Sequence, residues 1–404
     1  QFINWAAEAG VDAIDLSRGN ARSLATVYEV PPYNLEPGFN MDNIAAIKAR
    51  VNIPVIGVGR IVDPALADQL IREGKIDMVA VGRAQLADPE WCNKSKEGRE
   101  AEIRRCIGCT EGCYDKVIDP KAKHITCTRN PALCLEYKGL PKPETAKNVM
   151  VIGAGIGGME CALVLKQRGH TPVIFEKTNE LGGLFLTASA MSFKENDKEL
   201  IRWYLNEVAK EGIDVRFNTE VTDVNTLGGF DDIIVASGSI PRTMPSIPGF
   251  EKTLTFTELL KDKKEVGDKV LFIGGGQSSC EAAYDLVLQG KHPIIVEYAG
   301  DLVAAQATCL ANTSFLRDAM EYHKVPTYLE STVTEIKDNG VTVKNVKTGE
   351  TFFVECDDVV NGIGFVPTPV GGKDNKQVFR VGDCVAIGNL RTVIWRAWDV
   401  CMKI

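Results

Sequence analysis

The chain has 404 residues, of which 25% are charged and 45% hydrophobic, and its formal net charge is −8. This length exceeds one ordinary hydrophobic core and predicts two to four domains of a globular protein. The acidic balance argues against nucleic acid as a partner, and no run approaches the ~20 apolar residues of a membrane helix, so no membrane association is expected.

The first hundred residues alternate short apolar strands with helical segments. Strands are predicted at 11–16, 54–59 and 78–83, with helices near 42–49 and 64–73. This alternation predicts a parallel sheet covered by helices. Three strands cannot close a (β/α)8 barrel, so we interpret the segment as the C-terminal portion of such a barrel in preference to a small open domain.

The N-terminus and the cysteines indicate the cellular compartment of the protein. The chain opens on Gln1 with no charged-then-apolar leader, so we expect no signal peptide and an internal start. Several of the twelve cysteines lie in apolar contexts, as expected of buried thiols in a reducing compartment. We therefore expect a cytoplasmic protein.

Four cysteines form the most informative pattern in the chain: Cys106, Cys109, Cys113 and Cys127. Four thiolates at this spacing can hold an iron–sulfur cluster or a zinc ion. The pattern lies between the barrel-like segment and a nucleotide-binding segment, where a one-electron centre would complete an electron path and zinc would not. The context therefore favours the cluster, with structural zinc as the alternative.

A strand, glycine turn and helix start follow at 149–158. Gly153 permits the turn, Gly155 lets the backbone approach a pyrophosphate, and Gly158 lets the helix pack close to the strand. Glu176 closes the next strand, where a ribose hydroxyl needs an acceptor. The combination predicts a dinucleotide site.

A second copy begins at 270, with Gly274 and Gly276 in the turn and Glu297 as its acid. Ser279 replaces the third glycine, so the helix packing must tolerate a hydroxymethyl group. The carboxylate of Glu297 favours NADH over NADPH, because a 2′-phosphate would meet negative charge. The alternative is two glycine turns in unrelated α/β units.

The end of a strand at Gly382-Asp383, together with the run 235–238, resembles the elements that frame FAD in the two-dinucleotide-domain flavoprotein disulfide reductase superfamily. The resemblance implies that Asp383 contacts the flavin ribityl chain and that Gly183 belongs to the same cofactor site. It also implies that the second nucleotide unit interrupts the first, which resumes near Asn361.

The order of barrel end, cysteines, two fingerprints and Gly-Asp resembles the multidomain old yellow enzyme group over essentially the whole chain. This group includes 2,4-dienoyl-CoA reductase, 2-enoate reductase, trimethylamine dehydrogenase and the bile-acid-inducible NADH:flavin oxidoreductases. The resemblance implies a [4Fe–4S] cluster on Cys106, Cys109, Cys113 and Cys127. Cys92 and Cys134 fall outside that pattern and are interpreted as structural.

The barrel of this group binds FMN, with its phosphate in loops after the last two strands. The matching positions here are Gly59, Arg60, Gly82 and Arg83. Glycine amides and an arginine fork suit a phosphate dianion. Ordinary solvated arginines at strand ends are the alternative interpretation.

The resemblance implies an enzyme in which electrons pass from NADH through FAD and the cluster to FMN, which reduces an activated C=C bond. The run 17–22 lacks the histidine of dienoyl-CoA reductases, so an enoate, enoyl-CoA or steroid-like enone stays open as the small-molecule substrate. No catalytic residue or proton donor is assigned. A trimethylamine dehydrogenase-like amine oxidation and an electron-transfer module serving a partner are the alternatives, and a homo-oligomer is left open.

The predicted architecture is α/β throughout, with two nested Rossmann-like domains after the barrel portion and the connector. The expected boundaries are 1–100 for the FMN barrel portion, 101–147 for the iron–sulfur connector, 148–244 and 361–404 for the two parts of the FAD domain, and 245–360 for the NAD(P)H domain.

Overall fold

The computed structural model describes residues 1–19, 30–226, 228–304, 309–372 and 377–404. The chain divides into two compact units. The first comprises Gln1–Cys134 with Cys309–Asn312, and the second comprises Leu135–Thr308 with Thr313–Ile404. The run 17–22 extends beyond the first described segment, so only its first three residues are placed.

The first unit contains a parallel sheet of three strands, β1 (Ile14–Leu16), β2 (Val55–Gly57) and β3 (Met78–Val79), in that order. The predicted alternation with helices is confirmed, although each strand is shorter than expected. The strand at 78 ends early because the next helix already begins at Gly82. The helices are α1 (Phe2–Glu8), α3 (Met41–Lys48), α4 (Pro64–Arg72), α5 (Gly82–Ala87), α6 (Trp91–Lys96), η1 (Glu100–Glu102) and α7 (Tyr114–Ile118).

Local sequence explains where α4 begins. The Asp63 side chain accepts a 3.0 Å hydrogen bond from the N–H of Ala65, and Pro64 fills the first helical position, where no N–H is needed. Its inward residues, Ala67 and Leu70, join a buried apolar cluster with Val55 of β2. This cluster fixes the helices on the sheet.

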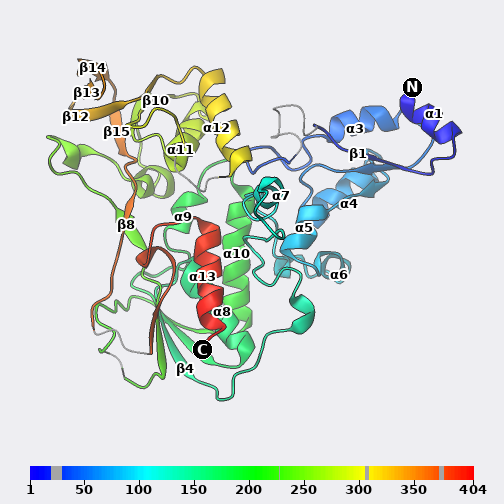
Figure 1. The fold of residues 1–404 in the computed structure, drawn as a ribbon, viewed down its shortest axis with the longest axis horizontal. Helices are drawn as coiled ribbons and strands as arrows, with labels where there is room; N and C mark the ends of the chain where they lie inside the picture. The colour runs from blue at the N-terminus through cyan, green and yellow to red at the C-terminus, as the bar shows by residue number, and fades with distance from the viewer. Residues whose placement is uncertain (20–29, 227, 305–308, 373–376) are drawn as a thin grey trace. The chain divides into compact units, whose positions relative to one another are not determined.

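The second unit begins with a five-stranded parallel sheet in the order β17-β7-β4-β5-β6. Helix α8 (Ile156–Arg168) follows β4 and is almost wholly buried, and Figure 1 shows α13 (Leu390–Cys401) running alongside it. Helices α9 (Phe185–Ala188) and α10 (Glu195–Lys210) come later in the same domain. The strands are β4 (Asn148–Ile152), β5 (Thr171–Phe175), β6 (Asp214–Arg216), β7 (Asp232–Val235) and β17 (Val378–Arg380).

A second parallel sheet has the order β11-β10-β9-β15, and a three-stranded antiparallel sheet, β12-β13-β14, shares a buried core with it. Helix α11 (Gln277–Leu288) follows β9, and α12 (Leu310–Tyr322) precedes β11. The strands are β9 (Lys269–Ile273), β10 (His292–Val296), β11 (Thr327–Tyr328), β12 (Ser331–Lys337), β13 (Gly340–Asn345), β14 (Thr351–Glu355) and β15 (Asp358–Asn361).

The two parallel sheets are nested in sequence. A two-stranded antiparallel ribbon, β8 (Ser239–Pro241) with β16 (Phe365–Pro367), carries the chain out of the first sheet and back again. Asn361 itself closes β15 in the second sheet, and the chain rejoins the first sheet at β17. The predicted interruption of one Rossmann-like domain by another is therefore present.

Candidate cofactor sites

The four predicted cluster cysteines line one cavity in the first unit. Its volume is about 20 Å³. The remaining lining residues are Arg83, Leu86, Ile107, Thr110, Gly112, Thr128 and Arg129. The spacing in the sequence therefore does bring Cys106, Cys109, Cys113 and Cys127 together.

A close backbone approach joins the two halves of the cysteine pattern. The N–H of Thr126 donates to the carbonyl of Gly112 at 2.7 Å. A Cβ atom on Gly112 would lie 2.6 Å from the Thr126 carbonyl oxygen, so any larger residue would push the two segments apart. This contact sets Cys113 beside Cys127.

Burial and hydrogen bonding shape the sulfur environment. Desolvation raises the pKa of the Cys127 thiol to about 11 and raises the pKa values of Cys109 and Cys113 as well. The Cys109 thiol donates to the Thr128 hydroxyl at 3.2 Å, and the N–H of Gly108 donates to the Cys106 sulfur at 3.4 Å. The raised pKa values of Cys109, Cys113 and Cys127 favour their neutral thiol forms, and a soft metal centre would have to displace those protons.

The donor set fits an iron–sulfur cluster. Among the described residues, no three His, Cys, Asp or Glu side chains converge on a position for a single ion. The four cysteines instead surround a cavity. Four cysteine thiolates are the ligand set of a [4Fe–4S] cluster, which these residues would hold between them.

A short segment that is distant in sequence completes the surroundings of this cavity. The Asn312 side-chain amide donates to the carbonyl of Cys109 at 3.2 Å, and the Thr110 hydroxyl lies in hydrogen-bond contact with the buried Cys309 thiol. Both residues belong to the first unit, although they start a helix about 200 residues further along. No periodicity or motif in the sequence signals this contact.

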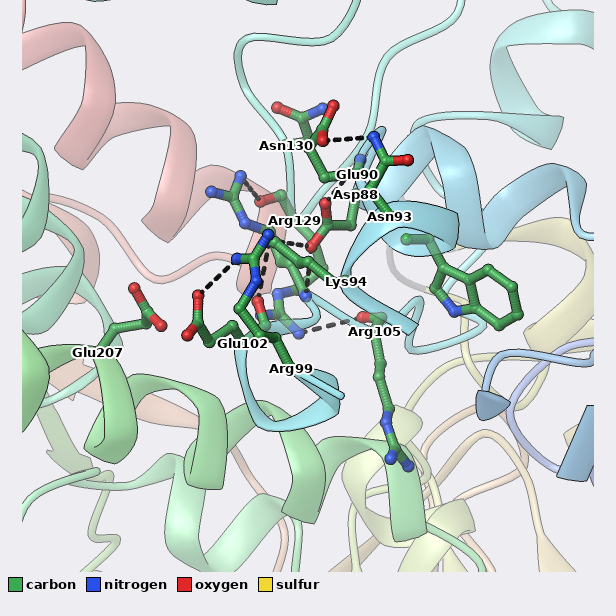
Figure 2. Close-up of polar contacts among 12 residues, drawn as sticks. Asp88, Glu90, Asn93, Lys94, Arg99, Glu102, Arg105, Arg129, Asn130 and Glu207 are labelled. Carbon is green, nitrogen blue, oxygen red and sulfur yellow. Dashed lines mark hydrogen bonds and ion pairs between the residues drawn. The ribbon is translucent and has the colours of Figure 1, made fainter. Parts of the chain in front are cut away.

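A polar network holds the chain on both sides of the cysteines, as Figure 2 shows. One Asp88 carboxylate oxygen accepts from Lys94 Nζ at 2.7 Å and from the backbone N–H of Arg104 at 2.8 Å. Arg129 Nη1 donates to the Arg105 carbonyl at 3.1 Å. Asn130 Nδ2 donates to the Leu86 carbonyl at 3.1 Å. The network ties the chain around Cys106 to the chain around Cys127.

The two predicted Gly-Arg phosphate pairs have different surroundings. Arg60 has a left-handed backbone (φ 55°), is buried, and donates to the Leu35 carbonyl. Arg83 is half-buried, donates to the Pro31 carbonyl at 2.9 Å and lines the cysteine cavity. Gly59 is buried beside Arg60, and Gly82 is exposed at the start of α5. Since both guanidinium groups contact backbone carbonyls here, their contact with a phosphate stays a prediction.

The first glycine loop leaves open backbone where a pyrophosphate would bind. Gly153 has φ 101°, and a Cβ there would lie 2.5 Å from the Ala236 carbonyl oxygen. A Cβ on Gly158 would nearly coincide with the Gly153 carbonyl oxygen, so α8 reaches β4 only with glycine at this position. Beside Gly155, by contrast, a Cβ would meet no atom within 4 Å.

The predicted acid and Gly183 both lie at this loop. Glu176 accepts from the N–H of Ala154 at 2.8 Å and from the N–H and hydroxyl of Thr178, each at 2.8 Å. Gly183 lies against Gly155, where a Cβ would come within 3.1 Å of the Gly155 Cα. Carboxylate oxygens have further lone pairs, so a ribose hydroxyl can still donate to Glu176.

The second glycine loop has the same acid-to-loop contact and open glycine as the first, but Ser279 replaces the third glycine. Glu297 accepts from the N–H of Gly275 and, at 2.6 Å, from that of Ala299. A Cβ on Gly276, the counterpart of Gly155, would meet no atom within 4 Å. The Ser279 side chain is accommodated because Gly362 opposes it, and a Cβ on Gly362 would collide with the Ser279 hydroxyl.

Gly382 and Asp383 lie in a 3-10 turn after β17, at the carboxyl ends of the first sheet. Asp383 accepts from the Ser239 hydroxyl at 3.3 Å and from the N–H of Gly388 at 3.2 Å. Burial raises the pKa of its carboxyl group, against the lowering effect of these two donors. The position is the crevice outside the strand ends where ligands of such sheets bind.

Comparison with known proteins identifies the family. Residues 125–230 and 147–398 match the pyridine nucleotide-disulphide oxidoreductase family, and residues 1–102 match the NADH:flavin oxidoreductase / NADH oxidase family. The chain belongs to the pyridine nucleotide-disulphide oxidoreductase family. Its first hundred residues carry the NADH:flavin oxidoreductase domain, so the predicted likeness to the multidomain old yellow enzyme group is confirmed.

Individual relatives match over almost the whole of this chain. The chain is 32% identical to a cinnamate reductase of Clostridium sporogenes, covering 98% of this chain and 60% of that protein. It is 34% identical to an NADH oxidase of Thermoanaerobacter brockii, covering 100% of this chain and 63% of that protein. A solved 2-naphthoyl-CoA reductase complex superposes with a TM-score of 0.87 at 27% identity, covering 100% of this chain and 62% of that one. The chain thus spans about three-fifths of the length of these relatives.

These family matches confirm the predicted fold class, the flavoprotein oxidoreductase class and the flavin and nicotinamide cofactors. The residue assignments, the domain boundaries and the expected partners stay predictions. Within the described residues, no helix has the length and apolar character needed to cross a bilayer.

Proposed function

We propose that this family member is an NADH-dependent reductase of activated C=C bonds, in which electrons pass from NADH through FAD and a [4Fe–4S] cluster to FMN. The substrate class we propose is an enoate, an enoyl-CoA or a related enone. The observation that carries the proposal is the cavity lined by all four cysteines, in a chain that also contains two glycine loops, each held by an acid.

The relatives support the substrate class. Cinnamate is an α,β-unsaturated acid, and the relatives named cinnamate reductase and 2-naphthoyl-CoA reductase both act on conjugated carboxyl derivatives by their names. Reducing the C=C bond of such an acceptor takes two electrons and two protons, which amount to a hydride at the carbon β to the carbonyl group and a proton at the α carbon. A small unsaturated molecule is therefore the partner we propose.

Some residues of this chain would bind the two nucleotide cofactors, and others would hold the centre that transfers electrons. The two glycine loops would bind pyrophosphates at the N-termini of α8 and α11, and Glu176 and Glu297 would orient the riboses. The four cysteines would hold a centre that accepts electrons singly, which joins a two-electron donor to a second flavin.

The test is to purify the native protein anaerobically and to measure FAD, FMN, iron and acid-labile sulfide per chain. We expect one of each flavin and about four each of iron and sulfide. NADH should then reduce cinnamate or a similar α,β-unsaturated acid, ester, thioester or enone. Flavin with zinc, or reduced flavin that reduces none of these acceptors, would contradict the proposal.

The variant Cys127→Ser distinguishes electron transfer through the cluster from the reduction of FAD by NADH. In Cys127→Ser, NADH should still bleach the FAD absorbance, whereas reduction of the unsaturated substrate should fall at least 100-fold because one cluster ligand is lost. Unchanged substrate reduction in this variant would show that electrons do not need the cysteine site.

A further inference from the structure

One of the residues that line the cysteine cavity is a buried arginine that no part of the proposed function uses. Arg129 lines the cavity with the four cysteines, and only 2% of its surface is exposed. A guanidinium group stays protonated at every pH at which a protein is folded. Burying it carries a large desolvation cost unless nearby groups compensate its charge.

The chain holds Arg129 in place from two directions. Its Nη1 donates to the Arg105 carbonyl at 3.1 Å, and its own carbonyl accepts from Arg104 Nη1 at 3.0 Å. Its backbone N–H bonds the Cys127 sulfur and lowers the pKa of that thiol, although desolvation raises it more. The bond to the Arg105 carbonyl holds the side chain, and the other two contacts hold the backbone of Arg129 beside Cys127.

Other charged groups near the cavity differ from Arg129. Arg83 also lines the cavity and lowers the pKa of Cys113, but it is half-buried and so partly screened by water. Arg105 is neutralised by Asp63 at 3.2 Å. Glu111 acts in the opposite direction and raises the pKa of Cys109. Arg129 is the cavity-lining cation that is nearly excluded from solvent.

A cluster on four thiolates has a net negative charge, and one added electron makes it more negative by one unit. Its reduction potential depends on net charge, hydrogen bonds to sulfur and solvent exposure. A fixed positive charge in a low-dielectric cavity stabilises the reduced state more than the oxidised state. The expected effect is a higher midpoint potential.

We propose that Arg129 sets the reduction potential of the centre held by the four cysteines, by placing one buried positive charge next to the chain that carries Cys106. This proposal rests on the proposed function, because it requires the cluster. It assigns to Arg129 a role beyond anchoring the chain, namely easing the uptake of one electron.

The experiment compares four forms of the native protein: wild type, Arg129→Gln, Arg129→Lys and Arg99→Gln. Gln keeps a donor for the Arg105 carbonyl and removes the charge, whereas Lys keeps the charge. Arg99 is a surface arginine paired with Glu97 and Glu102, so its variant removes one charge away from the cavity. The midpoint potential of the cluster is measured by redox titration followed by electron paramagnetic resonance, together with the iron content.

We expect Arg129→Gln to keep its iron and to lower the midpoint potential by at least ~59 mV, a tenfold change in a one-electron equilibrium. Arg129→Lys should stay near the wild-type potential, and Arg99→Gln should match the wild type. Equal potentials in wild type and Arg129→Gln, both with full iron, would overturn the proposal. Loss of iron in both Arg129 variants would also overturn it, because the residue would then be structural.

The iron content of the wild type distinguishes failure of this inference from failure of the proposed function. Wild-type protein that contains no iron would contradict the proposed function itself. If Arg129→Lys keeps iron while Arg129→Gln loses it, the charge is needed to retain the cluster and not to set its potential, and the proposal is overturned although the proposed function stands.

Discussion

The carboxylate of Glu176 accepts a 2.8 Å hydrogen bond from the backbone N–H of Ala154, in the turn of the first glycine loop. Glu297 and Gly275 make the same contact in the second loop, with the same separation of 22 residues. Each acid therefore shapes its own loop, in addition to the ribose contact that is predicted for it. Sequence reasoning assigns only the second of these roles.

This pairing predicts that the two acids affect different cofactors. Replacing Glu297 by Gln turns an amide NH2 toward one of the two N–H groups that the carboxylate accepts, and a hydrogen bond to a charged group contributes about 1.5–3 kcal/mol. We expect KM for NADH to rise about tenfold or more with FAD content unchanged. Glu176→Gln is the matched control and should lower FAD retention instead. Steady-state kinetics and the flavin content of the purified variants decide, and a rise in KM for NADH in Glu176→Gln alone would contradict the assignment.

Two glycines of one loop should respond differently to the same substitution. A methyl group on Gly158 would collide with the Gly153 carbonyl, so Gly158→Ala should not give folded protein. A methyl group on Gly155 meets no protein atom within 4 Å, so Gly155→Ala should fold but lose FAD where the pyrophosphate would contact the backbone. Circular dichroism and flavin content measure the two effects. A Gly155→Ala protein with full FAD would place the pyrophosphate elsewhere.

Local patterns predicted the elements of this chain better than the contacts around its sites. The glycine loops, their acids and the cysteine spacing lie in short windows, and backbone geometry dictates what each window forms. The burial of Arg60 and the place of Arg83 at the cysteine cavity depend on chain segments packed from elsewhere. Asn312 reaches Cys109 from a helix 203 residues away, which no local pattern encodes.

The exposed and the cavity-lining cysteines should differ in iron binding. Cys127 lines the cavity, whereas Cys134 is an exposed free thiol seven residues later. We expect Cys127→Ser to lose most of its iron and Cys134→Ser to keep all of it, since a hydroxyl is a poor ligand for a soft metal centre. Iron and sulfide assays on anaerobically purified protein test this. Iron loss in Cys134→Ser would mean that the fourth ligand has been assigned to the wrong cysteine.

A buried ion pair joins the segment before α10 to α11 and should contribute strongly to stability. Lys194 Nζ lies 2.5 Å from Glu281 Oε2, and both side chains are buried. Removing one partner leaves the other charge buried alone, which costs about 3–5 kcal/mol. Lys194→Met should therefore lower the free energy of unfolding by about this amount, and Lys194→Met combined with Glu281→Leu should recover most of it. Lys252→Met, at an exposed pair with Asp338, is the control and should change little.

The pH dependence of the stability lost in Lys194→Met tests whether Lys194 and Glu281 form an ion pair. Desolvation lowers the pKa of Lys194, but Glu281 and the nearby carboxylates outweigh it, so the pKa lies above the usual range of a lysine. A raised lysine pKa gives stability that is complete below the unfolded pKa and is lost as pH rises through the folded pKa. The difference between wild type and Lys194→Met in urea unfolding should therefore be constant from pH 7 to about 9.5 and shrink only above about 10.5. A difference that already shrinks near neutral pH would mean that Lys194 is not the charged partner of Glu281.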